Sequence, residues 1–490
     1  MKNNQFIKNT FFVFGTIISV FSANAQKKIT WVSTTEKQAW VVRNNIPKTK
    51  TVATNSIVLN PTQVLQTMEG FGTCFNEAGW FSLQLLPQKD QDYIFKELFS
   101  PNFGANLTVC RMPLGANDFS KDWYSYNETE GDFEMKNFSI ANDLNSLIPY
   151  IKKAQSYNPK IKIWASPWSP PSWMKYNKHY AAKSQIKGVT NNESEEWGIY
   201  FAGINNGLPQ DREGKEGQNM FIQEEPYFKA YAKYFGKFVS AYRQQNINIS
   251  MVMPQNEFNS AQPFPSCTWT ADGLNKFIKY LGPEMKAQNV DLFFGTMERA
   301  KHELVDSILT SPDGREYVKG VGFQWDGKGS IASIHERYPN LQLYQSEQEC
   351  GNGKNNWKYA KHTWDLMKHY IGNGASAYMY WNTSLLKGSI SRWGWKQNSM
   401  ISVDADTKTY QFNHDYFAFK HLSHFVKPGS KLLKSSSDYK NILAFLTPEN
   451  QIVVIIHNDQ PQTVTMNIKV GNKSITPTLS ADSFNTFVIK

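Results

Sequence analysis

Two glutamates, Glu257 and Glu347, each close a short apolar stretch of the chain, and 90 residues separate them. A pair of carboxyl groups can hydrolyse a glycosidic bond, because one protonates the leaving oxygen while the other attacks the sugar or activates a water. This chemistry requires no cofactor and no metal, so we expect neither. Spacing alone is weak support, since the chain has 42 acidic residues and most such side chains are simply solvated.

Other polar and aromatic side chains also follow apolar stretches of the chain. They are Asn76, Glu77, Arg111, Asn117, Asp118, Trp168, Trp173, Asn256, Glu298, Gln324, Trp325, Asp326, Glu349, Trp381 and Asn382. None of the nine histidines is among them, which argues against a histidine-ligated metal and against a Ser-His-Asp triad. Carboxylates surrounded by tryptophan rings favour a site that binds sugar rings.

The elements that must position these side chains are eight short apolar runs bounded by turn residues. The runs are Gly70–Phe75, Leu107–Pro113, Ile161–Ser166, Met251–Pro254, Leu292–Thr296, Val321–Trp325, Leu341–Gln345 and Ser376–Trp381. Several are apolar almost throughout, which is typical of parallel strands covered on both faces. Helical patterns separate many of them, most clearly at Phe228–Tyr242, which Pro226 opens. This alternation predicts an α/β fold, a (β/α)8 TIM barrel.

The barrel prediction brings the two glutamates together. Catalytic side chains of such barrels lie at the mouth, the face formed by the carboxyl ends of the strands. Glu257 and Glu347 are three strand–helix units of about 30 residues apart, so we expect them at the ends of strands four and seven, facing each other. The polar stretch at 176–217 indicates a long insertion after strand three that borders this mouth.

The pattern changes near residue 427, where short strands separated by Asn, Gly and Pro turns begin. Residues 464–470 alternate between apolar and polar, the signal of a half-buried strand. We therefore expect residues 66–425 to form the catalytic barrel and residues 426–490 an attached all-β sandwich. Strand-like segments within residues 26–65 are expected to join that sandwich.

The first 25 residues have the pattern of a signal peptide. Lys2 and Lys8 precede an apolar run at Phe11–Phe21, and small residues at 23–25 form a cleavage site. The run is shorter than the roughly 20 residues of a membrane span, and no later apolar segment is long enough. We expect an exported protein, periplasmic or secreted, whose mature form has no integral membrane segment.

Composition excludes several classes of protein. Hydrophobic residues make up 40% and aromatic residues 14% of the chain, which is the opposite of a disordered sequence. The net charge is +10, but the basic residues are scattered, so we expect no nucleic-acid partner. The four cysteines form no C-x-x-C pair, and we expect buried free thiols or one incidental bridge.

Six ordered motifs resemble a known enzyme family. The stretches MVMPQNE (251–257) and YQSE (344–347) resemble the catalytic strand ends of glycoside hydrolase clan A. Four more narrow the resemblance to family 30, the family of lysosomal glucosylceramidase: EGFGT (69–73), RMPLGANDFS (111–120), ASPWSPPSWMK (165–175) and WN (381–382). The resemblance covers about residues 60–490 and implies a barrel with a β-sandwich.

The resemblance also implies a role for each matched residue. Glu257 corresponds to the acid/base and Glu347 to the nucleophile of a retaining β-glycosidase. The expected substrate-binding residues are Arg111, Asp118, Trp168, Asn256, Trp325, Trp381 and Asn382. Within this set, Asn256 corresponds to the residue that binds the sugar 2-hydroxyl and Arg111 to a basic residue that supports the nucleophile.

Two positions depart from the family pattern. Asp326 stands where glucosylceramidase has a tyrosine near the nucleophile, and neither Asp326 nor Gln324 supplies that phenol. The carboxylate of Asp326 is expected to perturb Glu347. Glu349, two residues beyond Glu347, is a weaker candidate for the nucleophile.

We therefore expect a β-linked glycan or glycolipid substrate. The favoured activity is that of a glucosylceramidase or β-glucosidase, and the alternative is an endo-β-1,6-glucanase or another β-glycan hydrolase. A non-catalytic carbohydrate-binding protein is a further alternative, which predicts loss of Glu257 or Glu347. Both glutamates are present.

Overall fold

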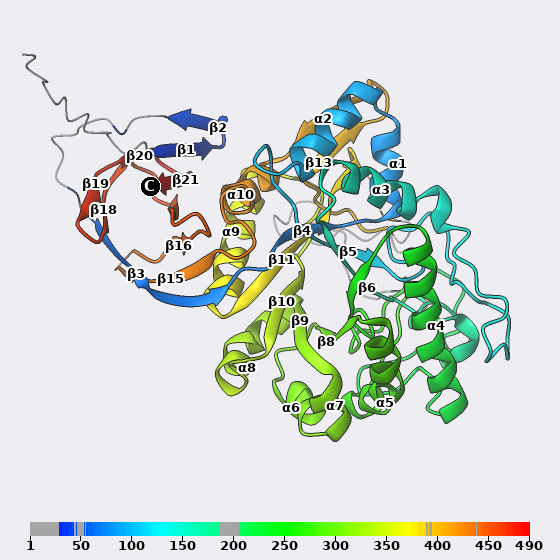
Figure 1. The fold of residues 1–490 in the computed structure, drawn as a ribbon. Helices are drawn as coiled ribbons and strands as arrows, with labels where there is room; N and C mark the ends of the chain where they lie inside the picture. The colour runs from blue at the N-terminus through cyan, green and yellow to red at the C-terminus, as the bar shows by residue number, and fades with distance from the viewer. Residues whose placement is uncertain are drawn as a thin grey trace, which may run out of the picture.

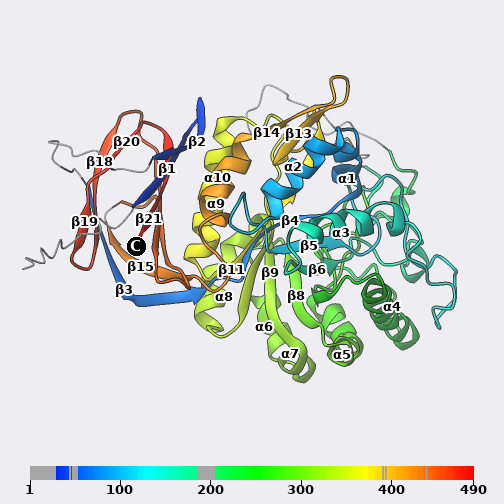
Figure 2. The ribbon, with the colours of Figure 1, turned by 45° about the horizontal axis from the view of Figure 1, so that its top comes forward.

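The structure is a computed structural model that describes residues 29–43, 46, 53, 55–185, 205–388, 391, 394–437 and 439–490. Two parts lie side by side, a barrel ringed by helices and a β-sheet part that holds the C-terminus (Figures 1 and 2). The expected signal peptide and residues 186–204 of the expected insertion lie outside the described residues.

Eight strands close into the barrel. They are β4 (Gly70–Cys74), β5 (Val109–Pro113), β6 (Lys162–Ser166), β7 (Ile249–Val252), β8 (Asp291–Met297), β9 (Val318–Gln324), β10 (Gln342–Glu347) and β11 (Ala375–Asn382). Every pairing is parallel, and each strand overlaps one of the eight predicted runs. The predicted (β/α)8 barrel is confirmed, and its parallel strands end together at one mouth.

Helices connect the strands and cover the barrel (Figure 1). They are α1 (Glu77–Gln84), α2 (Gln88–Phe99), α3 (Leu147–Tyr157), α4 (Glu225–Gln244), α5 (Ala271–Gln288), α6 (Glu303–Leu309), α7 (Pro312–Tyr317), α8 (Ile331–Arg337), α9 (Trp357–Gly372) and α10 (His414–Ser423). Short 3-10 turns occur at η1 (Asp143–Asn145), η2 (Ser172–Met174), η3 (Gln210–Arg212) and η4 (Trp325–Ser330). α4 buries the predicted apolar face and has Pro226 in its first turn, where a missing N–H leaves no hydrogen bond unmade.

Side chains from the barrel strands fill the interior below the mouth. One buried cluster contains Val109, Trp164, Met251, Met253, Phe293, Tyr344, Ala377 and Met379. Most of these residues lie on β5, β6, β7, β8, β10 and β11. The barrel is thus a packed core rather than a pore, and polar chemistry is confined to the strand ends above it.

Strands from both ends of the described chain form one ten-stranded sheet beside the barrel. Its strands are β1 (Thr30–Thr35), β2 (Gln38–Arg43), β3 (Asn55–Thr67), β15 (Lys431–Ser437), β16 (Ile442–Leu446), β17 (Ile452–Asn458), β18 (Val464–Val470), β19 (Lys473–Ile475), β20 (Thr478–Leu479) and β21 (Ser483–Ile489). The order is β19–β18–β3–β15–β16–β17–β21–β1–β2, and β20 pairs with β18. The sheet encloses a core of its own, with Trp31, Met466 and Phe487 at its centre. The attached all-β part is confirmed.

A small third sheet lies near the mouth. It consists of β12 (Ser384–Leu386), β13 (Ile401–Asp404) and β14 (Thr409–Phe412), and it follows directly after β11. It holds the segment between β11 and α10 against the barrel.

Helix α10 joins the barrel to the ten-stranded sheet. His421 is buried between the hydroxyls of Thr34 and Thr486, at 2.9 and 2.8 Å. Burial lowers the pKa of His421 to about 3, so this imidazole is neutral. The ammonium of Lys420 lies 4.3 Å from the ring centroid of Trp40, within the range of a cation–π contact. Specific polar and aromatic contacts therefore fix this junction.

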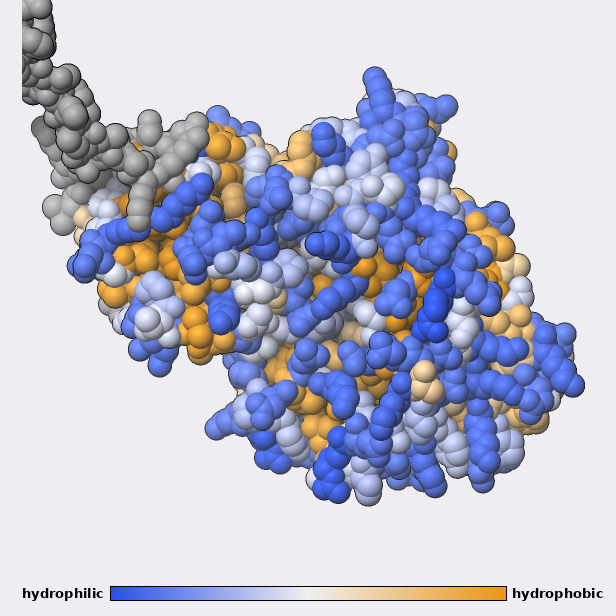
Figure 3. Space-filling model, viewed as in Figure 1, coloured by the Kyte–Doolittle hydropathy of each residue, from blue (hydrophilic) through white to orange (hydrophobic). Residues whose placement is uncertain are grey.

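The surface seen in Figure 3 is mainly hydrophilic, with apolar side chains gathered over the β-sheet part. Large apolar side chains on β2 and β3 are exposed, namely Val42, Val58, Val64 and Leu65. Within the described ranges, no helix is both long and apolar enough to cross a membrane. All four cysteines are buried and free, which is one of the two expected outcomes.

Candidate active site

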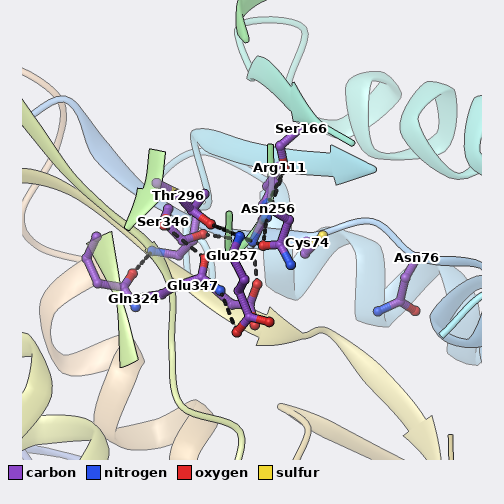
Figure 4. A network of polar contacts seen from close by, with 12 residues as sticks. Cys74, Asn76, Arg111, Ser166, Asn256, Glu257, Thr296, Gln324, Ser346 and Glu347 are labelled. Atoms are coloured by element: carbon purple, nitrogen blue, oxygen red, sulfur yellow. Dashed lines mark hydrogen bonds and ion pairs between the residues drawn. The ribbon is translucent and has the colours of Figure 1, made fainter. Parts of the chain in front are cut away.

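Arg111 on β5 ties three strand ends together at the mouth (Figure 4). Its side chain is fully buried, and Nε and Nη2 donate to Ser166 Oγ at 3.2 and 2.8 Å. Nη2 also donates to Asn256 Oδ1 at 2.7 Å, and Nη1 donates to Glu347 Oε2 at 2.5 Å. Because a guanidinium stays charged in proteins, Arg111 places a permanent positive charge against Glu347.

Glu347 is the last residue of β10, so the strand itself points its carboxyl group into the mouth. Burial raises the pKa of Glu347 above its usual range, and the adjacent Arg111 charge and its hydrogen bond offset part of that rise. The Arg111 guanidinium is therefore what favours the ionised form of this otherwise desolvated carboxyl group. A buried carboxylate in this setting is suited to act as a nucleophile.

Glu257 lies five residues beyond the end of β7, where the backbone leaves the strand. Its φ of +47° is in the left-handed region, which residues with a side chain seldom adopt. The Glu257 N–H donates to Thr296 Oγ1 at 2.9 Å, and that hydroxyl donates to Asn256 Oδ1 at 3.2 Å. Thr296, at the end of β8, thus fixes the turn that aims Glu257 into the mouth.

Asn256 has a defined amide orientation. Its Oδ1 accepts hydrogen bonds from both Arg111 and Thr296, and only an oxygen can accept from two donors. The Nδ2 group is therefore the donor that Asn256 presents on its other side. This arrangement suits the predicted role of binding a sugar hydroxyl.

Gln324, the last residue of β9, contacts both catalytic candidates. Its Nε2 donates to Glu257 Oε1 at 3.2 Å, and a hydrogen bond from the same side chain lowers the pKa of Glu347. Ser346 Oγ donates to Gln324 Oε1 at 3.2 Å, which turns the Gln324 amide nitrogen toward the carboxyl groups. One neutral amide thus bridges the two acids.

The pKa of Glu257 is raised well above its usual range. Burial is the largest cause, followed by the charges of Glu347, Glu298 and Asp118, and only the Gln324 hydrogen bond opposes them. No cation contacts Glu257 in the described part of the chain. Glu257 therefore retains a proton under conditions in which Glu347 is ionised, as a general acid requires.

Aromatic rings line the mouth around these groups. Trp168 and Trp381 stack with centroids 5.3 Å apart, and Arg111 lies 4.4 Å from the Trp168 centroid. Trp325 and Trp395 form a second, tilted pair at 5.9 Å and are only partly buried. The first pair forms the wall of the site, and the second leaves aromatic surface exposed for a ligand.

Asp118 is buried and has an unused acceptor. Its Oδ1 has no hydrogen-bond partner among the described residues, and the Nδ2 of the adjacent Asn117 likewise has none. Burial and the charge of Glu347 raise the pKa of Asp118 well above its usual range. Buried polar atoms are nearly always hydrogen-bonded, so these two atoms are groups that a bound sugar hydroxyl would satisfy.

Asn382 has its amide engaged by other protein groups. It is fully buried, its Oδ1 accepts from Asn76 Nδ2 at 3.0 Å, and its Nδ2 donates to Gln397 Oε1 at 2.8 Å. Asn76 in turn caps α1 through Gly79 N at 2.7 Å. Because Asn76 and Gln397 engage its amide, Asn382 connects the loops around Trp381, and its predicted contact with substrate stays a prediction.

Asp326 and Glu349 are engaged elsewhere than at Glu257 and Glu347, and for Asp326 this is contrary to expectation. The side chain of Asp326 is 82% exposed, and its charge is not among the causes that shift the pKa of Glu347. Glu349 is bound by Lys328 at 2.7 Å and by His362 at 3.0 Å, and hydrogen bonds from these residues lower its pKa despite burial. The structure favours Glu347 over Glu349.

Several supporting residues were not singled out from the sequence. They are Ser166, Thr296, Ser346 and, as a bridge between the acids, Gln324. Each is a polar residue at the end of an apolar strand, and that pattern is the only signal that could have marked them. Their partners depend on how neighbouring strands are staggered, which a single sequence does not reveal.

Across the described residues, no group of three or more His, Cys, Asp or Glu side chains could hold a metal ion. The site's donors are carboxyl, amide and hydroxyl groups arranged around one guanidinium. Such a set can transfer protons and supply a nucleophile.

Comparisons with known proteins agree with this geometry. The model of the glycosyl hydrolase family 30 TIM-barrel domain matches residues 68–206 and 210–426, and that of the family 30 beta sandwich domain matches residues 429–487. In fold, the chain is similar to SrfJ from Salmonella typhimurium, with a TM-score of 0.79, 22% sequence identity, and coverage of 94% of this chain and 99% of that one.

The names of two relatives state an activity. The chain is 28% identical over 438 residues to putative glucosylceramidase 1 of Caenorhabditis elegans, covering 84% of this chain and 77% of the relative. It is 24% identical over 433 residues to an endo-1,6-β-D-glucanase of Aspergillus fumigatus, covering 83% and 82%. With a closed barrel, a β-sandwich and matches to both domain models in order, the chain belongs to glycosyl hydrolase family 30 and is a glycosidase.

Proposed function

We propose that the protein is a retaining β-glycosidase that hydrolyses β-glucosidic bonds, with Glu347 as nucleophile and Glu257 as acid/base. The observation that carries this proposal is the unequal setting of the two carboxyl groups. Glu347 is paired with a buried guanidinium, whereas Glu257 is buried near three other carboxyl groups and has only an amide donor. Glu347 therefore loses its proton more readily than Glu257, which is the difference that a nucleophile and a general acid need.

The reaction proceeds in two displacements. Glu347 attacks the anomeric carbon, the bond to the leaving oxygen breaks, and that oxygen takes the proton of Glu257. Glu257, now ionised, removes a proton from a water, whose oxygen attacks the same carbon and releases Glu347. Two inversions at one carbon preserve the β configuration. A retaining pair requires carboxyl groups about 5–5.5 Å apart, and their shared contact with Gln324 supports such proximity.

The substrate sugar is held by groups that the protein leaves unused. Asn256 presents its Nδ2 donor, and Asp118 Oδ1 and Trp381 Nε1 are buried without partners in the described structure. A sugar ring with several hydroxyls offers both donors and acceptors for these atoms. The stacked wall of Trp168 and Trp381 supplies the apolar face that a β-linked pyranose also requires.

Covalent trapping tests the nucleophile and the stereochemistry together. A 2-deoxy-2-fluoro-β-glucoside with an activated leaving group should inactivate the enzyme, because fluorine slows both displacements while the good leaving group speeds only the first. Peptide mapping should then find the added mass on Glu347, and NMR of an ordinary substrate should show the β-anomer first. A label on Glu349, or initial release of the α-anomer, would contradict the assignment.

For the substrate, we propose a glucosylceramidase- or β-glucosidase-type activity, with endo-β-1,6-glucanase as the second candidate. The name of the Caenorhabditis elegans relative supports the first, and that of the Aspergillus fumigatus relative supports the second. The partly exposed Trp325 and Trp395 suit either a lipid chain or a further sugar. Hydrolysis rates on glucosylceramide, an aryl β-glucoside, β-1,6-glucan and xylan, with product lengths measured, separate the candidates, because mixed oligomers arise only from endo cleavage.

We also propose that the protein is exported and becomes periplasmic or secreted. The support is the charged, apolar and small-residue pattern of residues 1–25. When the full chain is expressed in a bacterium, N-terminal sequencing of the extracytoplasmic protein should begin at Gln26. A product that keeps Met1 and stays in the cytoplasm would contradict this proposal.

A further inference from the structure

The segment that carries Glu257 is held along one side by the end of β8. The N–H of Thr296 donates to Gln255 O at 2.6 Å, and its hydroxyl accepts from the Glu257 N–H. Two residues further, Glu298 Oε1 accepts from the N–H of Asn259 at 2.8 Å and from the hydroxyl of Ser260 at 2.9 Å. Thr296 and Glu298 therefore hydrogen-bond to the segment before and after Glu257, the residue with the left-handed backbone.

Glu298 is an unusual choice for a purely structural contact. Its side chain is 2% exposed, the nearest cation, Arg299, is 3.8 Å away, and Oε2 has no partner among the described residues. A glutamine could accept the same two hydrogen bonds through its Oε1 without burying a charge. A carboxyl group at this position therefore points to a function for its charge or its proton.

The charge of Glu298 acts on the acid/base. It is the second of the carboxylates that raise the pKa of Glu257, after Glu347 and ahead of Asp118. Burial raises the pKa of Glu298 itself to about 7, against the opposing effects of Arg299, Ser260 and Asn259. Arg299 is also paired with Glu216, whose Oε2 lies 3.0 Å from Arg299 Nε. The other oxygen of the Glu216 carboxylate lies 3.1 Å from Lys301 Nζ.

We propose that Glu298 is a positioning residue of this enzyme, which holds the segment at 256–260 through Oε1 while its negative charge keeps the proton on Glu257. The proposal rests on the proposed role of Glu257 as acid/base. It adds that Glu298, just beyond the end of β8, both positions the segment that carries Glu257 and acts on Glu257 through its charge. Substituting Glu298 should separate these two contributions.

The test compares Glu298→Gln with Glu298→Ala in pH profiles of kcat/KM on an alkyl β-glucoside. The glutamine retains an oxygen acceptor and removes the charge, so the pKa of Glu257 falls. The alkaline limb should then move about one pH unit toward acid, with activity at the optimum within about 3-fold. The alanine also releases the segment, and kcat should fall a further 10- to 100-fold, about the effect of a small misplacement.

Ser260→Ala is the matched control. It removes one of the two hydrogen bonds and no charge, so it should lower kcat modestly and leave the alkaline limb in place. Thermal melting of each variant shows whether the fold persists. An aryl β-glucoside with a good leaving group, which needs little acid assistance, should show much smaller effects in every variant.

Two results would overturn the proposal. One is an unchanged alkaline limb in a folded Glu298→Gln enzyme, and the other is an equal shift in Ser260→Ala. Failure of the proposed function is a distinct outcome. In that case the wild-type enzyme itself would show no alkaline limb that Glu257→Gln removes, and the aryl and alkyl substrates would respond alike.

Discussion

The strand ends of β10 and β7 carry the same chemical group in opposite surroundings. Glu347 is the last residue of β10 and is paired with Arg111. Arg111 in turn donates hydrogen bonds to Ser166 and Asn256. Glu257 lies beyond β7 in a left-handed turn, and the charges that shift its pKa are those of other carboxylates. Identical side chains thus acquire different protonation from what the neighbouring strands provide. The barrel makes the difference, because β5, β8 and β9 supply the partners.

The largest predicted effect tests whether the carboxylate at the end of β10 is the nucleophile. Glu347→Gln removes the attacking oxygen and should lower kcat by about 10⁴-fold or more, measured as release of an aryl group. Glu349→Gln is the matched control, since Glu349 is bound by Lys328 and His362 and should change kcat by less than about 3-fold. Comparable losses of kcat in both variants would contradict the assignment of Glu347, and not Glu349, as the nucleophile.

The second-largest predicted effect comes from removing Arg111, the cation that pairs with Glu347. Arg111→Met should lower kcat/KM by about 10²- to 10³-fold, the usual cost of losing one preorganised charged donor. Because Arg111 lowers the pKa of Glu347, its loss raises that pKa, and the acidic limb of the profile moves to higher pH. The alkaline limb, which reports Glu257, should move far less.

Since Arg111 is buried, the variant needs a check of folding. Near-ultraviolet circular dichroism reports whether the surrounding tryptophans keep their packing. Arg111→Lys retains the charge but cannot serve Ser166, Asn256 and Glu347 together, so it should recover the acidic limb but not the full rate. A folded Arg111→Met enzyme with an unmoved acidic limb would show that the cation does not set the ionisation of Glu347.

The smallest effect concerns Gln324, which contacts both acids. Gln324→Leu removes a hydrogen bond that lowers the pKa of Glu257 and of Glu347. Both pKa values should rise, so the entire bell-shaped profile should shift to higher pH by several tenths of a unit, with kcat reduced about 10-fold. A shift of one limb alone would show that Gln324 serves only one of the two carboxyl groups.

The barrel could be predicted from the sequence because its strands are buried on both faces. Their apolar runs are short and distinct, and all eight appear in the structure near the predicted residues. The helix α4 was equally clear, since its apolar residues recur at helical spacing from Phe228 to Tyr242. These features depend on local patterns, which a single sequence contains.

The positions of Glu257 and Glu347 were predicted from strand ends and from the family motifs. The support of Glu347 by Arg111 was predicted from the family motifs as well. The contacts of Gln324, Thr296 and Glu298 were not, because they join strands that are distant in sequence. The prediction that the carboxylate of Asp326 perturbs Glu347 was wrong. The backbone of Asp326 follows Trp325, whose φ of +46° turns the chain out of the strand, so its carboxylate reaches solvent instead of Glu347.

The pairing of β1 with β21 has a consequence for how the protein is made. Trp31 pairs with Phe487 across these strands, and β3 pairs with β15, so the ribosome must deliver the entire barrel before the sheet can close. Until then, β1 and β3 have exposed edges and no partner from the C-terminal strands. Closure of such a distant contact is slow, and β1 gains its partner β21 only after the barrel has been synthesised. A chain that lacks β21 leaves one edge of β1 and one edge of β17 without a partner, and such exposed strand edges favour aggregation.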